Sequence, residues 1–246
     1  MNISVELLDR ISKEYGESFY LLDSVQFENN YKELQKAFKD IYPNFRIAYS
    51  YKTNYIPKLC KLIDQNGGIA EVVSEMEYEL AVKIGVHPKN IIFNGPYKNA
   101  KAVENLLIEG GTVNIDSNYE LEIIKEVAER NTEKQLLVGL RCNFDIKDGV
   151  TSRFGFDIDG EDFKNAVNTI HQICNVNLIG LHCHFATRSI ETWSRRAEQM
   201  LKLAQNIFTD MFKGEREACP LPLKSKKGEY IPVETRVWFG KWNDEN

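Results

Sequence analysis

"GIAEVVSEMEYELAVKIGVHPKNIIFNG", residues 68–95, contains one strand–helix–strand unit and decides the fold class. The apolar runs GIAEVVS (68–74) and NIIFNG (90–95) have the length of buried strands. Between them, SEMEYELAVKIG (74–85) has apolar residues at helical spacing and ends at Gly85, a favourable C-terminal stop. Strands that alternate with helices in this way predict parallel βαβ units.

The same alternation extends in both directions along the chain. Further apolar runs of strand length are FYLLDS (19–24), RIAYSYK (46–52), TVNIDS (112–117), LLVGLRCN (136–143) and LIGLHCHFAT (178–187). Helical patterns cover SVQFENNYKELQKAFKDI (24–41), which begins at a serine that can cap it, and NYELEIIKEVAERN (118–131). This spacing fits a TIM-type (β/α) barrel, with a doubly wound open sheet as the competing architecture. No GxGxxG follows the first strand, which argues against a dinucleotide-binding fold.

Composition excludes several classes of function. The chain has 246 residues, a net charge of −5 and 43% hydrophobic residues, which is ordinary globular composition. A negative charge gives no support to nucleic-acid binding. No run of about 18 apolar residues predicts a membrane span, and the N-terminal residues lack the features of a secretory signal. The five cysteines are scattered without CxxC spacing, so we expect free thiols in a cytoplasmic protein.

Alternation within the strands separates an apolar face from a face with small and titratable residues. The face expected to pack against helices carries Ile47, Tyr49, Tyr51, Val138, Leu140, Cys142, Ile179, Leu181, Cys183 and Phe185. The opposite face carries Ala48, Ser50, Lys52, Leu137, Gly139, Arg141, Asn143, Leu178, Gly180, His182 and His184. In a barrel, the titratable residues at the strand ends gather at the C-terminal mouth, where active sites lie. Glu71, at the end of its strand, is expected to join them.

Lys52 ends a strand, whereas most lysines lie on the surface. A partly dry barrel mouth disfavours the charged form of an amine, and a neutral amine attacks an aldehyde. Pyridoxal phosphate is the common cofactor that carries such an aldehyde. An imidazole such as that of His184 could stack on its ring, and Thr187 offers a hydroxyl for its phosphate. The simpler alternatives are a solvated lysine and a hydrogen-bonded core histidine. His182 and His184 also hint at a metal, but without a carboxylate at ligand spacing no metal site is predicted.

Seven motifs carry a family resemblance: AYSYKTN, GIAEVVSEMEYELAVKIG, IIFNGPYK, NIDSNYEL, LRCN, SRFGFD and GLHCHFAT. Within residues 15–210 they resemble, in order, the N-terminal barrel of the ornithine/diaminopimelate/arginine decarboxylases. These are fold-type III pyridoxal-phosphate enzymes with an alanine-racemase-like barrel. The resemblance implies pyridoxal 5'-phosphate as cofactor and Lys52 as its Schiff-base lysine. By the same resemblance the cofactor-binding residues are Lys52, Glu71, Arg141, His184 and Thr187, and further candidates are Glu77, His182 and Ser74.

The resemblance implies a function as well as a cofactor. The expected activity is decarboxylation of a basic or diamino acid, such as diaminopimelate or ornithine, in lysine or polyamine biosynthesis. Family members are head-to-tail dimers, but the residues that their sites borrow from the partner are absent here, which leaves a homodimer open. One alternative is a non-catalytic pyridoxal-phosphate-binding or racemase-like barrel. An alternative from another class is a sensory or interaction protein.

The resemblance ends after the sixth expected barrel strand. The family continues with a Gly-rich phosphate loop, a glutamate for the pyridine nitrogen and a β-domain, whereas Gly214, Gly228 and Gly240 are isolated here. We therefore expect an incomplete barrel over residues 1–213 and a β-hairpin tail over 214–246, around the turn KSKKGE. The tail resembles the closing strands of a PAS-type sensor domain. The sequence leaves open whether a deletion, a fusion or a gene-model artefact joined the two parts, and whether the chain is active.

Overall fold

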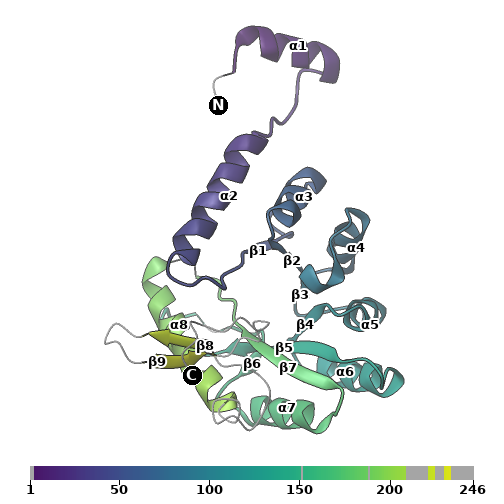
Figure 1. Cartoon of the computed structure of the whole chain (residues 1–246), viewed down its shortest axis with the longest axis vertical. Helices are drawn as coiled ribbons and strands as arrows, with labels where there is room; N and C mark the ends of the chain where they lie inside the picture. The colour runs from purple at the N-terminus through teal and green to yellow at the C-terminus, as the bar shows by residue number, and fades with distance from the viewer. Residues whose placement is uncertain (1–2, 151, 188, 209–220, 225–229, 234–246) are drawn as a thin grey trace.

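The computed structural model describes residues 3–150, 152–187, 189–208, 221–224 and 230–233 (Figure 1). Seven parallel strands form one sheet in the order β1-β2-β3-β4-β5-β6, and β7 also pairs with β5. The strands are β1 (Ala48–Ser50), β2 (Ile69–Val72), β3 (Ile91–Phe93), β4 (Thr112–Ile115), β5 (Leu136–Asn143), β6 (Phe156–Asp157) and β7 (Val176–His182). The six predicted barrel strands are confirmed, and the two-residue β6 is additional.

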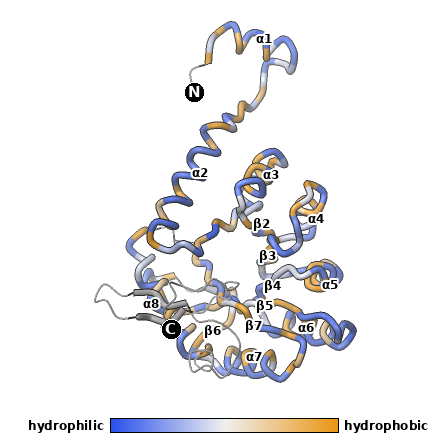
Figure 2. The backbone as a smooth tube through the Cα atoms, in the orientation of Figure 1, coloured by the Kyte–Doolittle hydropathy of each residue, from blue (hydrophilic) through white to orange (hydrophobic). Residues whose placement is uncertain are grey.

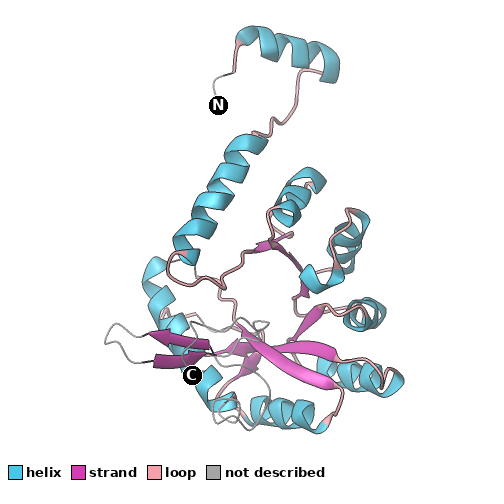
Figure 3. Ribbon diagram, viewed as in Figure 1, coloured by secondary structure: helices cyan, strands magenta, loops and turns pink. Residues whose placement is uncertain are grey.

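Two helices precede β1, and the later helices alternate with the strands along the chain. The helices are α1 (Val5–Tyr15), α2 (Ser24–Lys39), α3 (Pro57–Gln65), α4 (Glu75–Lys83), α5 (Ala100–Ile108), α6 (Asn118–Arg130), α7 (Glu161–Gln172) and α8 (Trp193–Ile207), with 3-10 turns η1 (Pro88–Asn90) and η2 (Ile190–Thr192). Helices α3 to α7 line the outer side of the curved sheet (Figures 1 and 3). This is the arrangement of a barrel and not of a doubly wound sheet, which has helices on both faces. Within the described residues, β1 and β7 do not pair with each other, so the barrel is incomplete as expected.

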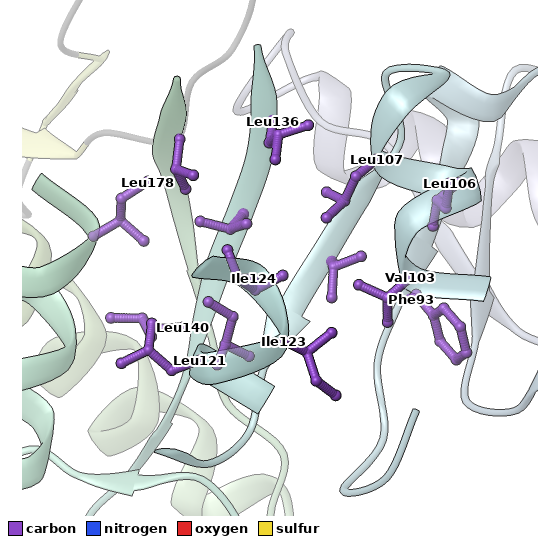
Figure 4. Packing of buried hydrophobic residues seen from close by; sticks show 14 of the residues in the cluster. Phe93, Val103, Leu106, Leu107, Leu121, Ile123, Ile124, Leu136, Leu140 and Leu178 are labelled. Carbon is purple, nitrogen blue, oxygen red and sulfur yellow. The ribbon is translucent and has the colours of Figure 1, made fainter. Parts of the chain in front are cut away.

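Apolar side chains between the sheet and the outer helices form the core. Phe93, Leu106, Ile124 and Leu140 have no more than 1% of their surface exposed, and Figure 4 shows them packed together with neighbours from the strands and helices. The helices alternate apolar and polar positions along their length (Figure 2), which lets one side pack and the other remain in water. None of the helices in the described ranges is long and apolar enough to cross a lipid bilayer.

Local signals set the bounds of α4 as the sequence predicts. The Ser74 hydroxyl accepts a hydrogen bond from the Glu77 amide at 3.3 Å and caps the N-terminus of the helix. After the last helical turn, Gly85 has a φ of 78°, a left-handed conformation that favours glycine. The helix predicted over residues 118–131 is likewise confirmed as α6.

The strand predicted at residues 19–24 is wrong. Residues 19–23 have no regular structure, and Ser24 is already the first residue of α2. The cap of this helix is Asp23, whose carboxylate accepts a hydrogen bond from the Gln26 amide at 2.9 Å. Tyr20 is fully exposed, and α1 with the start of α2 projects away from the sheet (Figure 1), so the apolar run has no neighbouring strand to pair with.

The predicted faces of β7 need one correction. Leu178 is opposite Val138 of β5, but the next pairing joins Gly180 to Gly139, so Ile179 is an extra residue on β7. Such a bulge shifts the alternation of side chains by one position. Leu178 is therefore buried in the core with Leu181 packed against it, and does not share the face of the histidines as predicted.

The strands β8 (Leu221–Lys224) and β9 (Tyr230–Val233) pair antiparallel, which confirms two strands around the predicted turn. Residues 225–229 of this turn, and residues 214–220 and 234–246 of the predicted tail, lie outside the described residues. The division into domains and the resemblance to a PAS-type sensor stay predictions.

Candidate functional site

A pocket of about 780 Å³ lies at the carboxyl ends of the barrel strands. It brings together five of the predicted site residues: Lys52, Glu71, Arg141, His182 and His184. They come from β1, β2, β5 and β7 or from the residues that directly follow these strands. Parallel strands place their carboxyl ends at the same edge, which explains how residues up to 132 positions apart in sequence (184 − 52) meet here.

Lys52 lies in the turn that follows β1, two residues after the strand ends at Ser50. The alternation predicted for this segment is confirmed, because Ala48, Ser50 and Lys52 line the pocket while Tyr51 is buried in the core. The partly dry environment expected for the Lys52 amine is wrong, because the described residues leave the Lys52 side chain exposed. The reason is the free edge of β1, where no further strand of the described chain covers the side chain.

Arg141 is held from behind by Asp116, a residue that the sequence did not single out as a site residue. Its guanidinium donates a hydrogen bond to the Asp116 carboxylate at 2.6 Å, and both side chains are more than 90% buried. The second Asp116 oxygen accepts from the Gly155 amide at 3.3 Å. The Nε of Arg141 is buried without a partner among the described residues. Arg141 therefore lines the pocket in a fixed orientation, and its Nε–H is available to donate a hydrogen bond.

A second buried ion pair supports Asp116. The Lys98 ammonium, whose side chain has no exposed surface, donates to the Glu120 carboxylate at 2.7 Å and to the Gly95 carbonyl at 2.7 Å. Glu120 accepts from the Asp116 amide at 2.8 Å. Burial lowers the pKa of Lys98 and raises that of Glu120, and the contact between them opposes both shifts. The four charges of Lys98, Glu120, Asp116 and Arg141 balance.

Neither ion pair was predicted, although the sequence contains a signal. The pattern Ser-x-x-Glu occurs after β2, as Ser74 and Glu77, and again after β4, as Ser117 and Glu120. In both places the glutamate reaches back to the amide that precedes the serine, at 2.8 Å. The repeated pattern identifies buried glutamates at two neighbouring strand ends.

Glu77 and Ser74 do not line the pocket. The Glu77 carboxylate is turned inward onto the Val73 amide, and burial raises its pKa. Val73 itself lines the pocket. Ser74 and Glu77 thus stabilise the start of α4 and the backbone beside the pocket. Contact of either residue with a ligand stays a prediction.

Thr187 lies next to the pocket lining, and its hydroxyl donates to the carboxylate of Asp148. Asp148 belongs to the segment after β5, residues 144–155, which contributes Asp148, Val150, Ser152, Arg153 and Phe154 to the pocket. The Thr187 carbonyl accepts from Arg196 of α8 at 2.5 Å. The structure therefore assigns this hydroxyl to holding the segment, while the predicted contact with a phosphate stays a prediction.

The two pocket histidines are neutral at physiological pH. Burial lowers the pKa of His182 to about 4, helped by the guanidinium of Arg141, which is its register partner on β5. Burial also lowers the pKa of His184, with the positive charges of Lys52 and Arg141 acting in the same direction. No group of three or more potential metal ligands occurs within the described residues.

The pKa of His182 predicts acid destabilisation. An unfolded histidine has a pKa near 6.5, so between pH 6.5 and 4 the unfolded chain binds more protons than the folded chain. The contribution of His182 is present above pH 6.5 and is lost as the pH falls towards 4, by about 3 kcal/mol. Urea unfolding of the wild type and of His182→Asn at pH 7, 6, 5 and 4.5 measures it. The variant should lose less free energy of unfolding on acidification; parallel curves would contradict the assignment.

The pocket has the chemistry to hold a small anionic ligand that carries an aldehyde. Lys52 provides an exposed amine. The Nε of Arg141 and the hydroxyl of Ser50 are buried polar atoms without a described partner, and both residues line the pocket. Buried donors of this kind are normally satisfied by hydrogen bonds. Pyridoxal phosphate offers acceptor oxygens and an aldehyde, so these residues fit it.

Comparison with known proteins identifies relatives of this site. The profile of the family "pyridoxal-dependent decarboxylase, pyridoxal binding domain" matches residues 26–212. A diaminopimelate decarboxylase of Aquifex aeolicus is 26% identical over 215 residues, which are 81% of this chain and 49% of that protein. An L-glutamyl-[BtrI acyl-carrier protein] decarboxylase of Niallia circulans is 30% identical over 85% of this chain and 50% of its own length.

The fold also matches solved structures. A crystal structure of diaminopimelate decarboxylase from Methanocaldococcus jannaschii superposes with a TM-score of 0.73 at 24% identity. The aligned region covers 82% of this chain and 50% of the other chain. This likeness shows that the two chains share a fold. The chain spans about half the length of these relatives.

Proposed function

Because the chain belongs to the family of pyridoxal-dependent decarboxylases through their pyridoxal-binding domain, we propose that it acts in the decarboxylation of an amino acid. The observation that carries this proposal is the meeting of Lys52, Arg141 and His184 in one pocket at the strand ends. The family is defined by pyridoxal binding, and this pocket contains the amine and the unpaired donor that such a ligand requires.

Four residues of the pocket have a proposed role toward the cofactor. When bound, pyridoxal phosphate supplies an aldehyde and an electron-withdrawing ring that favours loss of carbon dioxide from an attached amino acid. The Lys52 amine would hold the cofactor covalently through its aldehyde group. Arg141, fixed by Asp116, donates to an anionic oxygen. His184, whose pKa is lowered by burial, would offer a flat neutral face to the ring, and Glu71 would provide a hydrogen-bond acceptor in the same pocket.

The substrate class follows from the relatives only in outline. Relatives are named for diaminopimelate and for a glutamyl group on a carrier protein, which share an amino acid centre and differ in the rest. We propose a basic or diamino acid as the substrate. Asp148 supports this choice because it is an acidic residue of the pocket lining, and a carboxylate can bind a distal ammonium group in addition to the Thr187 hydroxyl.

Assembly and location complete the proposal. A homodimer is supported by the resemblance of the motifs to dimeric family members. A cytoplasmic location is supported by Cys60, Cys142, Cys174 and Cys183, which are free thiols in the part of the chain that the structure describes. Gel filtration with light scattering measures the oligomeric state, and fractionation of cells measures the location.

Covalent trapping tests the proposed function. The chain is incubated with pyridoxal phosphate, reduced with borohydride and mapped by mass spectrometry. We expect the label on Lys52, its loss in Lys52→Ala, and its retention in Lys58→Ala, which removes an exposed lysine of α3. Label that is absent or spread evenly over lysines would refute the cofactor site.

An assay of released carbon dioxide with diaminopimelate, ornithine, lysine and arginine then tests the reaction itself. A chain that holds the label on Lys52 without releasing carbon dioxide would be a pyridoxal-phosphate-binding barrel and not a decarboxylase on its own.

A further inference from the structure

A row of hydrogen-bonded side chains crosses three neighbouring strands at the pocket. Asn94 Nδ2 donates to Glu71 Oε1 at 2.9 Å, and Asn114 Nδ2 donates to Asn94 Oδ1 at 2.6 Å. Glu71 lies on β2, Asn94 directly follows β3 and Asn114 lies on β4. All three side chains line the pocket. We call Glu71, Asn94 and Asn114 the polar row.

Chemistry fixes the direction of the polar row. An ionised carboxylate only accepts hydrogen bonds, so the amide nitrogen of Asn94 must face Glu71. The amide oxygen of Asn94 then faces Asn114 and requires its nitrogen as the donor. Each asparagine is thereby locked in one of its two flips, and the row presents a donor to Glu71.

The far end of the polar row depends on a glycine. Asn114 is the register partner of Gly139 on β5, and a Cβ atom built on Gly139 would lie 2.0 Å from Asn114 Oδ1. The amide of Asn114 thus occupies the space that a side chain at position 139 would fill. On the near end, Ser50 is the register partner of Glu71, and its buried hydroxyl has no partner among the described residues.

We propose that Asn94 and Asn114 are positioning residues, which hold the Glu71 carboxylate directed at a donor or cationic group of the pocket ligand. This inference rests on the proposed function for the identity of that ligand. Asn94 is the one side chain in the described part of the chain that donates to Glu71, so its loss frees the carboxylate to rotate. The Ser50 hydroxyl, on the residue paired with Glu71, is a further polar group available to the same ligand.

His184 reports on the position of Glu71 without any cofactor. The charged groups that act on its imidazole are Lys52 after β1, Arg141 on β5, Arg196 on α8 and Glu71 on β2. The three cations lower the pKa of His184, and Glu71 raises it. A Glu71 carboxylate that rotates away or becomes neutral therefore lowers the pKa of His184 further.

The first arm of the test is an NMR titration of the four histidines in the cofactor-free chain. Glu71→Gln sets the full effect, a downward shift of the His184 pKa. We expect a shift in the same direction for Asn94→Leu, which removes the amide at nearly constant size. Asn29→Leu makes the same change on the exposed face of α2 and should leave His184 unchanged.

A second pair of variants breaks the polar row without touching Asn94. Gly139→Ala displaces the Asn114 amide and should also lower the pKa of His184. Gly180→Ala is the matched control, because a Cβ atom there meets nothing within 4 Å. An unchanged His184 in both Asn94→Leu and Gly139→Ala, with a shift in Glu71→Gln, would overturn the positioning role. An unchanged pKa of His184 in Glu71→Gln would overturn the placement of the Glu71 carboxylate close to the imidazole of His184.

The second arm measures the dissociation constant of pyridoxal phosphate by its absorbance. We expect binding roughly tenfold weaker in Glu71→Gln and Asn94→Leu, as for the loss of one hydrogen bond to a charged group. Equal affinity in these variants and the wild type would overturn the role of the row in ligand binding. If even the wild type fails to bind, the proposed function fails, whereas the titration of His184 still decides the positioning of Glu71.

Discussion

Replacement of Lys98 by methionine should lower the free energy of unfolding by about 3–5 kcal/mol. The ammonium of Lys98 has no exposed surface and is the ion-pair partner of Glu120, whose side chain is 4% exposed. Methionine fills most of the volume but leaves the Glu120 carboxylate buried and without its counter-charge. Its other oxygen, Oε1, already lacks a partner among the described residues, and Oε2 keeps only the hydrogen bond from the Asp116 amide.

The matched control for Lys98→Met is Lys83→Met. Lys83 of α4 pairs with Glu79 at 3.1 Å, but the two side chains are 73% and 55% exposed. Water screens such a pair, and its loss should change stability by less than about 1 kcal/mol. Urea unfolding of both variants and of Lys98→Met/Glu120→Gln measures the difference. The double variant removes both charges and should recover part of the loss. Equal effects of Lys98→Met and Lys83→Met would contradict the buried pair.

The Lys98 prediction also concerns the site, because the same ammonium binds the carbonyl of Gly95. Gly95 lines the pocket and follows Asn94 of the polar row. Its φ of 101° is left-handed, and a Cβ atom there would lie 2.8 Å from the Val73 carbonyl. Loss of Lys98 thus loosens a turn that only glycine fits and that carries part of the pocket wall.

Replacement of Leu140 by alanine should lower the free energy of unfolding by about 3–5 kcal/mol. Leu140 lies in the centre of β5 with 0% of its surface exposed. Its register partners are Ile115 on β4 and Leu181 on β7 (Figure 4 shows Leu140 within the core). A strand that is paired on both sides cannot move to fill the space, so the lost side chain leaves a cavity.

Leu34→Ala is the control for Leu140→Ala, because Leu34 of α2 is 50% exposed. This variant should cost less than about 1 kcal/mol, since its removal opens no cavity. Unfolding by urea, with the slope against denaturant compared between variants, separates a loss of stability from a change of the unfolded state. A cost for Leu140→Ala no greater than that for Leu34→Ala would show that the core of β5 does not support the barrel.

The sequence by itself determined the local elements and the edge at which the site lies. The apolar runs and helical spacing of residues 68–95 predict β2, α4 and β3, and the structure has them in these places. The period of two over residues 48–52 places Lys52 on the pocket side and Tyr51 in the core. These features could be predicted because periodicity, caps and strand ends act over a few residues.

Residues 19–24 do not form the predicted strand, because local periodicity does not decide strand pairing. An apolar run forms a strand only if another strand pairs with it, and the sequence does not state where the neighbours are. At this position an aspartate begins a helix instead. The bulge at Ile179 is a similar case, because the extra residue appears only when β7 is aligned with β5.

Only the tertiary structure decided which polar residues meet. Arg141 binds Asp116, 25 residues before it, Lys98 binds Glu120, 22 residues after it, and Asn94 donates to Glu71, 23 residues before it. These distances in sequence are one βα unit each, so the partners become neighbours through the register of adjacent parallel strands. Register is set by the packing of the whole sheet against its helices, which no local pattern contains. For the same reason the exposure of Lys52 follows from the free edge of β1 and not from the residues around it.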